Sequence, residues 1–379
     1  MQACAERQQE MVLFLEKLVN IDSMIDNPEG TAQIAKILGA KLQKMGFSVE
    51  TFDGGDLPTN LLARKKSANP DAKTILVLGH MDTVFKKGTV AERPFTIIGD
   101  KAYGPGVVDM KSGITLALFA LENLYSLGWD KHNIVICFAG DEEYGHPDTN
   151  FKQRLMEVAR ECDLAFNMET GFDNGDVVIA RRGVMYPVIQ VEGISAHAGK
   201  DPEKGANAIR ELAYKIEQFY GLDDPVRGTN FNAGVIRGGI IANGVAGYAE
   251  LESDFRFNRA KDQPHIVEQL EKVIAEVHVP KTKTTMKIDD VRTFLPMEKV
   301  EGTDKILDVV KEQAKKVGLD INGIMVGSGS DSCWVTYVGT PIICAMGGRG
   351  GMSHGEKEYL HLNSLTDKSQ IFALTLQYI

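Results

Sequence analysis

The stretch from Thr74 to Phe138 decides the fold class. It opens with the apolar run Thr74-Ile-Leu-Val-Leu78, continues through SGITLALFALENLYSL at 112–127, and closes on Asn133-Ile-Val-Ile-Cys-Phe138. The two short runs are apolar throughout, as in strands covered on both faces, whereas the middle segment has helical spacing and ends at Gly128. Strand, helix and strand in this order predict an α/β fold with a central, mostly parallel sheet.

Segments on both sides extend this pattern. Apolar runs at 163–167 and 341–345 predict further strands, and helical spacing predicts helices at 8–18, 31–45 and 304–317. Between them, strands at 188–192 and 249–256 with helices at 205–220 and 263–276 have a β-α-β-β-α-β-like order. We therefore expect a discontinuous α/β domain over 1–180 and 293–379, with an inserted α+β domain over 181–292.

The amino-acid composition limits the kinds of binding partner and the cellular location that the protein can have. The chain has 42 Lys and Arg against 52 Asp and Glu, a net charge of -10, which argues against nucleic acid or an anionic membrane. No apolar run approaches the roughly 18 residues of a spanning helix, and the charges between Met1 and Glu10 do not suit a signal peptide. We expect a cytoplasmic protein. No CxxC pair occurs, which favours free, mostly buried thiols at Cys4, Cys137, Cys162, Cys333 and Cys344.

Histidine and acidic residues follow the predicted strands at their carboxyl ends. After the strands at 74–78, 133–138, 163–167 and 341–345 come, in that order, His80 with Asp82, Glu142 with Glu143, Glu169, and His354. Ligands of open α/β sheets bind at that edge, and carboxylates gathered there would repel one another unless cations lay among them. The pattern predicts a metal site. Two divalent ions, most readily Zn2+ with Co2+ or Mn2+ as alternatives, would suit the set His80, Asp109, Glu143, Glu169 and His354.

Taken singly, these residues also have structural interpretations. His80 could be an ordinary buried histidine, although Asp82, two residues on, could hold its second ring nitrogen as a metal ligand requires. Asp109 could cap the helix at 112–127 or bridge two cations. Glu142 and Glu143 could be a solvated pair, or one could hold an ion while the other takes a proton from water.

Six motifs occur in order along nearly the whole chain. They are Gly79-His80-Met81-Asp82-Thr83-Val84, Gly104-Pro-Gly-Val-Val-Asp109-Met-Lys-Ser-Gly113, Asp141-Glu142-Glu143, Glu169, Ser195-Ala-His197-Ala-Gly199 and Ser353-His354. Together they resemble the M20 metallopeptidases, most closely the glutamate carboxypeptidase (carboxypeptidase G2-like) branch. The resemblance implies a two-zinc exopeptidase or amidohydrolase with a zinc-exopeptidase-like catalytic domain. The inserted domain would be a ferredoxin-like lid that pairs across a homodimer.

The resemblance also implies which residues bind metal. His80 and Glu169 would bind one zinc ion, Glu143 and His354 would bind the other, and Asp109 would bridge them. It further implies a cis peptide bond between Asp109 and Met110.

Other residues receive roles in catalysis and substrate binding from the same resemblance. Asp82 would orient the first histidine ligand, and Glu142 would be the general base. His197 would reach the partner subunit's site and stabilise the oxyanion beside Asn243, although the run Asn243-Gly-Val-Ala246 lacks the proline usual there. Arg292 would hold the substrate carboxylate, or form a surface or interdomain salt bridge instead.

The reaction expected is hydrolysis of an amide bond to an amino acid with a free carboxylate, with glutamate the first choice. An N-acyl amino acid amidohydrolase, such as a desuccinylase, deacetylase or aminoacylase, would use the same metal site. A non-catalytic binding protein would have lost the base or a ligand, and a mononuclear enzyme would place Glu169 or His354 away from the cluster. We interpret the glycine-rich run 327–331 as a substrate-side loop near the metals, with Asp331 behind the ligands.

Overall fold

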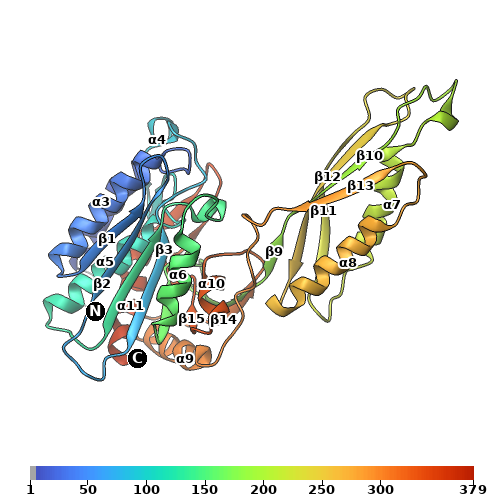
Figure 1. Ribbon diagram of the computed structural model, residues 1–379. Helices are drawn as coiled ribbons and strands as arrows, with labels where there is room; N and C mark the ends of the chain where they lie inside the picture. The colour runs from blue at the N-terminus through green and yellow to red at the C-terminus, as the bar shows by residue number, and fades with distance from the viewer. Residues whose placement is uncertain (1–5) are drawn as a thin grey trace. The chain divides into compact units, whose positions relative to one another are not determined.

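The computed structural model describes residues 6–379, which form two compact units (Figure 1). Unit 1 contains the chain up to 180 together with 299–326 and 330–379, and unit 2 contains 181–298 and 327–329. Unit 2 includes 293–298, beyond the range expected for the inserted domain. Backbone hydrogen bonds explain this, because Phe294 N–H donates to the Val184 carbonyl and Arg181 N–H donates to the Met297 carbonyl.

Unit 1 is built on a six-stranded sheet. Its strands lie in the order β1 (Ser48–Asp53), β2 (Thr59–Lys65), β6 (Asn133–Ala139), β3 (Thr74–His80), β7 (Leu164–Asn167) and β15 (Ile342–Ile343). The pairs β6–β3, β3–β7 and β7–β15 are parallel, whereas β1 and β2 form an antiparallel edge. The predicted α/β class with a mostly parallel sheet is confirmed, and the hairpin at 48–65 was not predicted.

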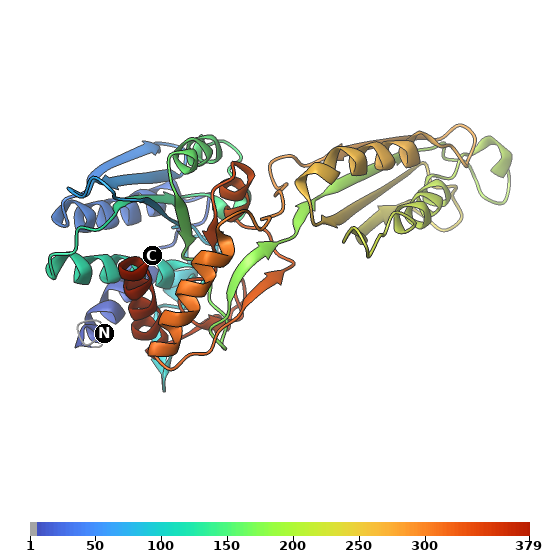
Figure 2. The ribbon, with the colours of Figure 1, turned by 90° about the horizontal axis from the view of Figure 1, so that it is seen from below.

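Helices cover both faces of this sheet (Figure 2). One face carries α2 (Gln8–Val19), α3 (Pro28–Lys44), α5 (Lys111–Ser126), α9 (Thr303–Lys316) and α11 (Asn363–Tyr378), and the other carries α6 (Phe151–Arg160) and α10 (Ser332–Tyr337). The central strands β3 and β6 are buried from both sides, which is why their sequences are mostly apolar. Helix α5 is buried along most of its length against α2 and α11.

Short elements complete unit 1 around the carboxyl ends of the parallel strands. One small sheet has the order β16 (Gly350–Gly351), β17 (Tyr359–His361), β5 (Lys101–Tyr103) and β4 (Thr96–Ile98), and β14 (Gly323–Val326) pairs with β8 (Val177–Arg181). Helix α4 (Thr89–Glu92) and the 3-10 helix η1 (Glu142–Tyr144) lie in loops. None of these elements was predicted from hydrophobic periodicity, because each is too short to show a period.

Unit 2 is an antiparallel sheet with two helices. The sheet has the order β11 (Asn230–Gly238), β12 (Tyr248–Phe257), β10 (Pro187–Glu192) and β13 (Lys283–Ile288), and β9 (Gly183–Met185) pairs with β12. Helices α7 (Ala208–Tyr220) and α8 (Gln263–Ala275) pack on it, with 3-10 turns η2 (Pro202–Lys204) and η3 (Ala260–Asp262). Helix α7 begins later than the expected 205 because the Asn207 side chain accepts the Arg210 N–H and caps it. The predicted β-α-β-β-α-β order is confirmed.

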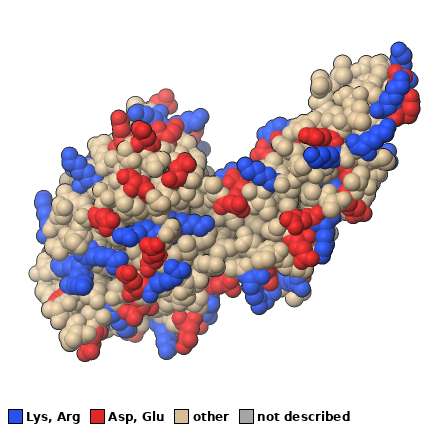
Figure 3. Space-filling view, viewed as in Figure 1, with Lys and Arg blue, Asp and Glu red and all other residues tan. Residues whose placement is uncertain are grey.

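Three expectations from composition can be compared with the described residues. Cys137, Cys162, Cys333 and Cys344 are buried thiols outside any disulfide, as predicted, while Cys4 lies outside the described residues. No helix within 6–379 is long and apolar enough to cross a membrane. On the face drawn in Figure 3, basic and acidic side chains are interspersed, so neither sign forms a continuous field there.

Candidate metal centre

The carboxyl ends of the parallel strands gather the predicted ligands of unit 1. Strand β3 ends at His80, η1 follows β6 with Glu142 and Glu143, and Glu169 comes two residues after β7. Two groups of three residues have donor atoms within 4.8 Å of one another. They are His80 with Asp109 and Glu143, and His80 with Glu142 and Glu169.

Asp109 lies between two imidazoles. Its Oδ1 is 3.3 Å from His80 Nε2, and its Oδ2 is 3.3 Å from His354 Nε2. The peptide bond to Met110 is cis, as the resemblance implied. Helix α5 begins at Lys111 with Met110 at the cap position and no side-chain cap, so the alternative that Asp109 caps this helix is wrong.

The remaining acidic side chains complete the centre. Glu143 Oε2 lies 3.1 Å from His354 Nε2, and Glu169 Oε1 lies 3.9 Å from His80 Nε2. Glu142 and Glu169 are each 8% exposed, and His80 is 1% exposed. The Glu143 side chain is 7% exposed, so the alternative that Glu142 and Glu143 are a solvated surface pair is wrong.

The pKa values reflect this crowding of charge. Burial, and then the charge of Asp109, raise the pKa of Glu143 to about 7, and burial raises the pKa of Glu142 well above its usual value. Hydrogen bonds to Asp109 and Glu143 raise the pKa of His354 to about 11. Burial alone would lower the pKa of His80, but its carboxylate partners outweigh burial and raise it. The carboxylates thus attract positive charge, which protons or bound cations can supply.

Asp82 connects a histidine to the loop that carries the two glutamates. Its Oδ1 lies 3.3 Å from His80 Nδ1 and accepts the Glu142 N–H at 3.1 Å. Its Oδ2 accepts the Glu143 N–H at 3.0 Å. Asp82 is fully buried, so it fixes both the ring of His80 and the start of η1.

Two sets of buried contacts near the metal centre were not predicted from the sequence. The Glu358 carboxylate accepts backbone N–H groups of Gly106, Val108 and Asp109. Burial, then the charge of Asp109, raise the pKa of Glu358 to about 7. Its position four residues after His354 was the available signal, but a single acidic residue in a loop is weak evidence.

The second missed contact concerns His146. Its Nδ1 lies 2.8 Å from Asp141 Oδ1, and its Nε2 lies 2.8 Å from Asp331 Oδ1. Asp331, the last residue of the glycine-rich run, is thereby joined to the residue that precedes Glu142. Sequence reasoning placed Asp331 behind the ligands, but it did not single out His146.

The predicted residues of the inserted domain lie in unit 2. Segment 196–198 pairs with 243–245, since Ala198 N–H donates to the Asn243 carbonyl and His197 bridges to Gly244. This pairing brings exposed His197, in the loop after β10, beside exposed Asn243, in the loop between β11 and β12. Arg292 comes after Ile288, the partner of Pro187 at the opposite end of β10. The structure therefore does not bring Arg292 to His197 within unit 2.

Arg292 is exposed and has a local acidic partner. Its Nε donates to Asp289 Oδ2 at 2.7 Å, and its guanidinium lies 5.0 Å from the centre of the Tyr186 ring. A salt bridge, the alternative interpretation, is thus present in unit 2.

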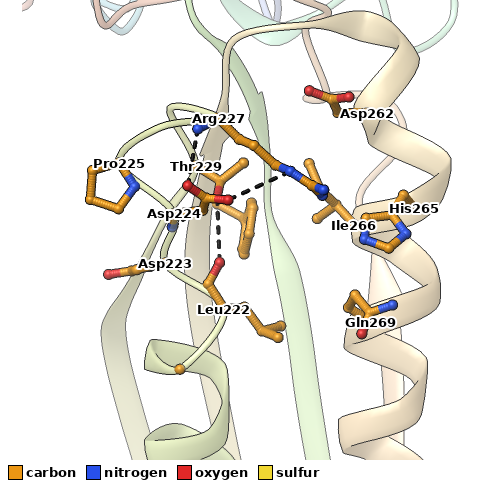
Figure 4. A pocket seen from close by; sticks show the side chains of 12 residues that line it. Leu222, Asp223, Asp224, Pro225, Arg227, Thr229, Asp262, His265, Ile266 and Gln269 are labelled. Atoms are coloured by element: carbon orange, nitrogen blue, oxygen red, sulfur yellow. Dashed lines mark hydrogen bonds and ion pairs between the residues drawn. The ribbon is translucent and has the colours of Figure 1, made fainter.

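Unit 2 also contains a cavity of about 360 Å³ (Figure 4). Asp224 and Arg227 from the turn before β11 face His265 and Ile266 of α8 across it, and Phe255 also lines it. Asp224 Oδ2 lies 3.5 Å from Arg227 Nε, so these charges are paired with each other. None of the predicted site residues lines this cavity.

The donors of the centre in unit 1 fit a divalent metal site. Imidazole nitrogens and carboxylate oxygens are the ligands that Zn2+ and similar ions accept, and no thiolate is needed. The near-complete burial of the Glu169 carboxylate would be unfavourable without a positive partner. Asp82 supplies the acceptor that a ligating histidine requires at its other nitrogen.

Comparisons with known proteins agree with this geometry. Residues 76–378 match the model of peptidase family M20/M25/M40. Carboxypeptidase G2 of Pseudomonas sp. (strain RS-16) is 29% identical over 371 residues, covering 96% of this chain and 88% of that protein. Succinyl-diaminopimelate desuccinylase of Psychrobacter sp. (strain PRwf-1) is 25% identical, covering 99% and 96%.

A solved structure shows the same fold. Aminopeptidase PepT from Bacillus cereus superposes with a TM-score of 0.79 at 21% identity, covering 98% of each chain. The resemblance to the M20 metallopeptidases, drawn from six motifs, is confirmed by the family match. The chain belongs to peptidase family M20/M25/M40 and is a metal-dependent hydrolase.

Proposed function

We propose that the protein is a two-zinc metallopeptidase that removes a C-terminal amino acid with a free carboxylate, in the manner of a glutamate carboxypeptidase. The observation that carries the proposal is the placement of Asp109 between His80 and His354, with each carboxylate oxygen 3.3 Å from one imidazole. The similarity to carboxypeptidase G2 over 96% of the chain supports this substrate class.

The ligand assignment follows the contacts. His80 and Glu169 would hold one ion, Glu143 and His354 the other, and Asp109 would bridge them. The proximity of Glu169 and His354 to the cluster supports two ions over the mononuclear alternative. Zn2+ suits the mixed nitrogen and oxygen donors best, and Co2+ or Mn2+ would serve as substitutes.

Glu142 is the proposed general base. Divalent ions bound at this centre would polarise the scissile carbonyl and make water more acidic. Glu142, nearly buried beside His80 and Glu169, would take a proton from the attacking water and later give it to the leaving amine. Burial keeps the pKa of its carboxyl raised, which suits both proton transfers. Asp82 would hold His80 and the Glu142 backbone in place.

The inserted domain would complete the site through a homodimer. His197 would stabilise the oxyanion in the partner subunit's site with Asn243 beside it, and Arg292 would bind the substrate carboxylate. Exposed apolar side chains on the edge strand β11 and the turn after it support self-association, since Ile236 is 57% exposed and Ile240 is 99% exposed. An unpaired strand edge with exposed apolar residues is well suited to pair with a second copy.

An N-acyl amino acid amidohydrolase is the second candidate. The similarity to succinyl-diaminopimelate desuccinylase, which covers 99% of this chain, favours it. Both reactions would use the same ligands and the same base. A non-catalytic binding protein is the least favoured reading, because His80, Asp109, Glu142, Glu143, Glu169 and His354 are all present and clustered.

A matched substrate panel tests the proposal. Metal-reconstituted protein is given C-terminal glutamate, aspartate, leucine and alanine dipeptides beside their N-acetyl and N-succinyl counterparts, with Glu142→Gln as the blank. Preference for C-terminal glutamate, lost in the blank, is the expected result. Preference for N-acetyl or N-succinyl substrates would move the assignment to an amidohydrolase. Activity that survives in Glu142→Gln would overturn the proposed base.

A further inference from the structure

Glu358 makes an unusual set of contacts beside the candidate metal centre. Its Oε2 accepts the Gly106 N–H at 3.0 Å, and its Oε1 accepts the Val108 and Asp109 N–H groups at 2.9 and 3.0 Å. The side chain is fully buried, although it carries a carboxylate. One side chain therefore binds three donors of a single turn, and one of these donors belongs to Asp109 itself.

The turn that Glu358 binds is tightly built. Gly106 has φ +72, and a Cβ there would lie 2.5 Å from Thr83 Cγ2. The Gly106 carbonyl accepts the Lys111 N–H at 3.1 Å. On its other side, the Val108 carbonyl accepts the Thr170 hydroxyl at 3.2 Å, one residue after the proposed ligand Glu169. Contacts with Lys111, Thr170 and Glu358 thus fix the backbone of the turn. Glu358 is the only one of these three that contributes a carboxylate.

Glu358 belongs to the loop that carries His354. Its own N–H donates to the Gly355 carbonyl at 3.1 Å, and β17 begins at the next residue, where Tyr359 pairs with Tyr103 of β5. The loop of His354 and the turn of Asp109 are therefore joined both by a strand pair and by the Glu358 carboxylate. These are the two segments whose side chains meet at 3.3 Å.

We propose that Glu358 is a positioning residue of the metal centre, which fixes Asp109 against His354 by holding the backbone of the turn at 106–109. The proposal rests on the metal centre proposed above. It predicts that loss of the carboxylate changes the geometry at the ions while all proposed ligands remain.

The variant Glu358→Gln tests this with Co2+ as the probe. Gln has one acceptor oxygen, so its amide N–H2 would face a backbone N–H in place of an acceptor. We expect the visible absorption spectrum of the Co2+-loaded protein to change, and Co2+ affinity or kcat to fall about 10-fold to 100-fold. KM should change little, because Glu358 does not touch substrate in this proposal.

A matched control separates positioning from general stability. Glu211 is also a fully buried carboxylate that accepts two backbone N–H groups, from His278 and Val279, but it lies in unit 2. Both N–H groups bind the same oxygen, and the other oxygen lies 3.2 Å from Lys215 Nζ, so Glu211→Gln removes a buried carboxylate charge away from the metal centre. It should leave the Co2+ spectrum as in the wild type. If Glu358→Gln does not fold, as judged by circular dichroism, Glu358→Asp takes its place. Asp keeps the charge and both oxygens but is one methylene shorter, so the same changes are expected.

The outcomes are distinct. An altered Co2+ spectrum with weaker Co2+ binding in the Glu358 variant, and neither in Glu211→Gln, supports the proposal. A wild-type spectrum and affinity in the Glu358 variant would overturn it while leaving the metal centre intact. Equal spectral changes in both variants would also overturn it. Wild-type protein that binds no Co2+ would overturn the proposed centre, and this inference with it.

Discussion

Asp109 and His354 face each other across 3.3 Å, from carboxylate Oδ2 to imidazole Nε2. The other oxygen of Asp109 lies at the same distance from His80 Nε2. Each oxygen of the Asp109 carboxylate thus contacts a different histidine. A substitution that removes one of these oxygens therefore tests whether Asp109 bridges two ions.

Asp109→Asn replaces one oxygen by an amide nitrogen, which cannot ligate a cation. We expect the metal content, measured by elemental analysis after reconstitution, to fall from two ions per chain, and the activity to fall by more than about a hundredfold. Asp304→Asn, at an exposed carboxylate paired with Lys299, is the control and should keep two ions. Two tightly bound ions in Asp109→Asn would contradict the bridging role.

Asp82→Asn tests the contacts behind the ligands. The amide N–H2 of Asn would meet a backbone N–H of Glu142 or Glu143, leaving one buried donor without an acceptor. Such a loss costs about 1–3 kcal/mol in the free energy of unfolding, measurable by urea denaturation. The activity should fall about 10-fold to 100-fold with the ions retained. Unchanged stability and activity would show that Asp82 has no orienting role.

The long-range arrangement of the fold could be predicted only in part. Continuous apolar runs identified β3, β6 and β7, because strands buried on both faces need apolar residues at every position. Helix α3 begins at Pro28, earlier than the expected 31, since proline suits the first helical turn. The sheet order, with β2 beside β6 and β3 beside β7, depends on pairing between distant segments and is absent from local patterns.

The residues of the candidate site could likewise be predicted from the sequence only in part. His80, Glu142 and Glu169 could be predicted because each lies at the end of an apolar strand or shortly after it. Glu358 and His146 act through contacts with residues far away in the chain, and neither stands in a motif that chemistry alone would mark. Buried polar contacts of this kind follow from packing, so they became visible only once the loops were placed.

His146→Leu removes the bridge between Asp141 and Asp331. Burial alone would lower the pKa of His146, but the two aspartates outweigh it and raise the pKa well above its usual value, so the bridge is charge-assisted. Without His146, two buried carboxylates lose their partner, and we expect a loss of roughly 3–5 kcal/mol in the free energy of unfolding. His265→Leu, at a half-exposed histidine, should change it by less than about 0.5 kcal/mol. Similar melting temperatures for the two variants would refute the assignment.

Lys368 gives the stability of unit 1 a pH dependence. Burial, then the charge of Arg349, lower its pKa to about 7, against the attraction of Asp176 and Asp367. In the unfolded chain the pKa of a lysine is about 10.4. Between these values the unfolded state binds more protons, so this group makes the free energy of unfolding rise with pH.

Lys368→Met removes that contribution. Its Nζ donates to the Gly175 carbonyl, so the variant loses one hydrogen bond but no longer buries an ammonium group. Urea unfolding at about pH 7 and about pH 9 should show a smaller rise in the free energy of unfolding for the variant than for the wild type. An equal rise in both proteins would assign the pH dependence to other groups.

Mixing two inactive variants tests whether His197 acts across a homodimer. His197→Ala keeps Glu142 and the proposed metal ligands of its own chain, whereas Glu142→Gln keeps His197. In a mixed dimer, the site that has an intact Glu142 would receive His197 from the other chain, while the second site would lack both. Random exchange makes half of the dimers mixed, so about a quarter of the wild-type activity should return on mixing equal amounts. If His197 instead acts within its own chain, both sites of the mixed dimer lack one group, and mixing would restore nothing.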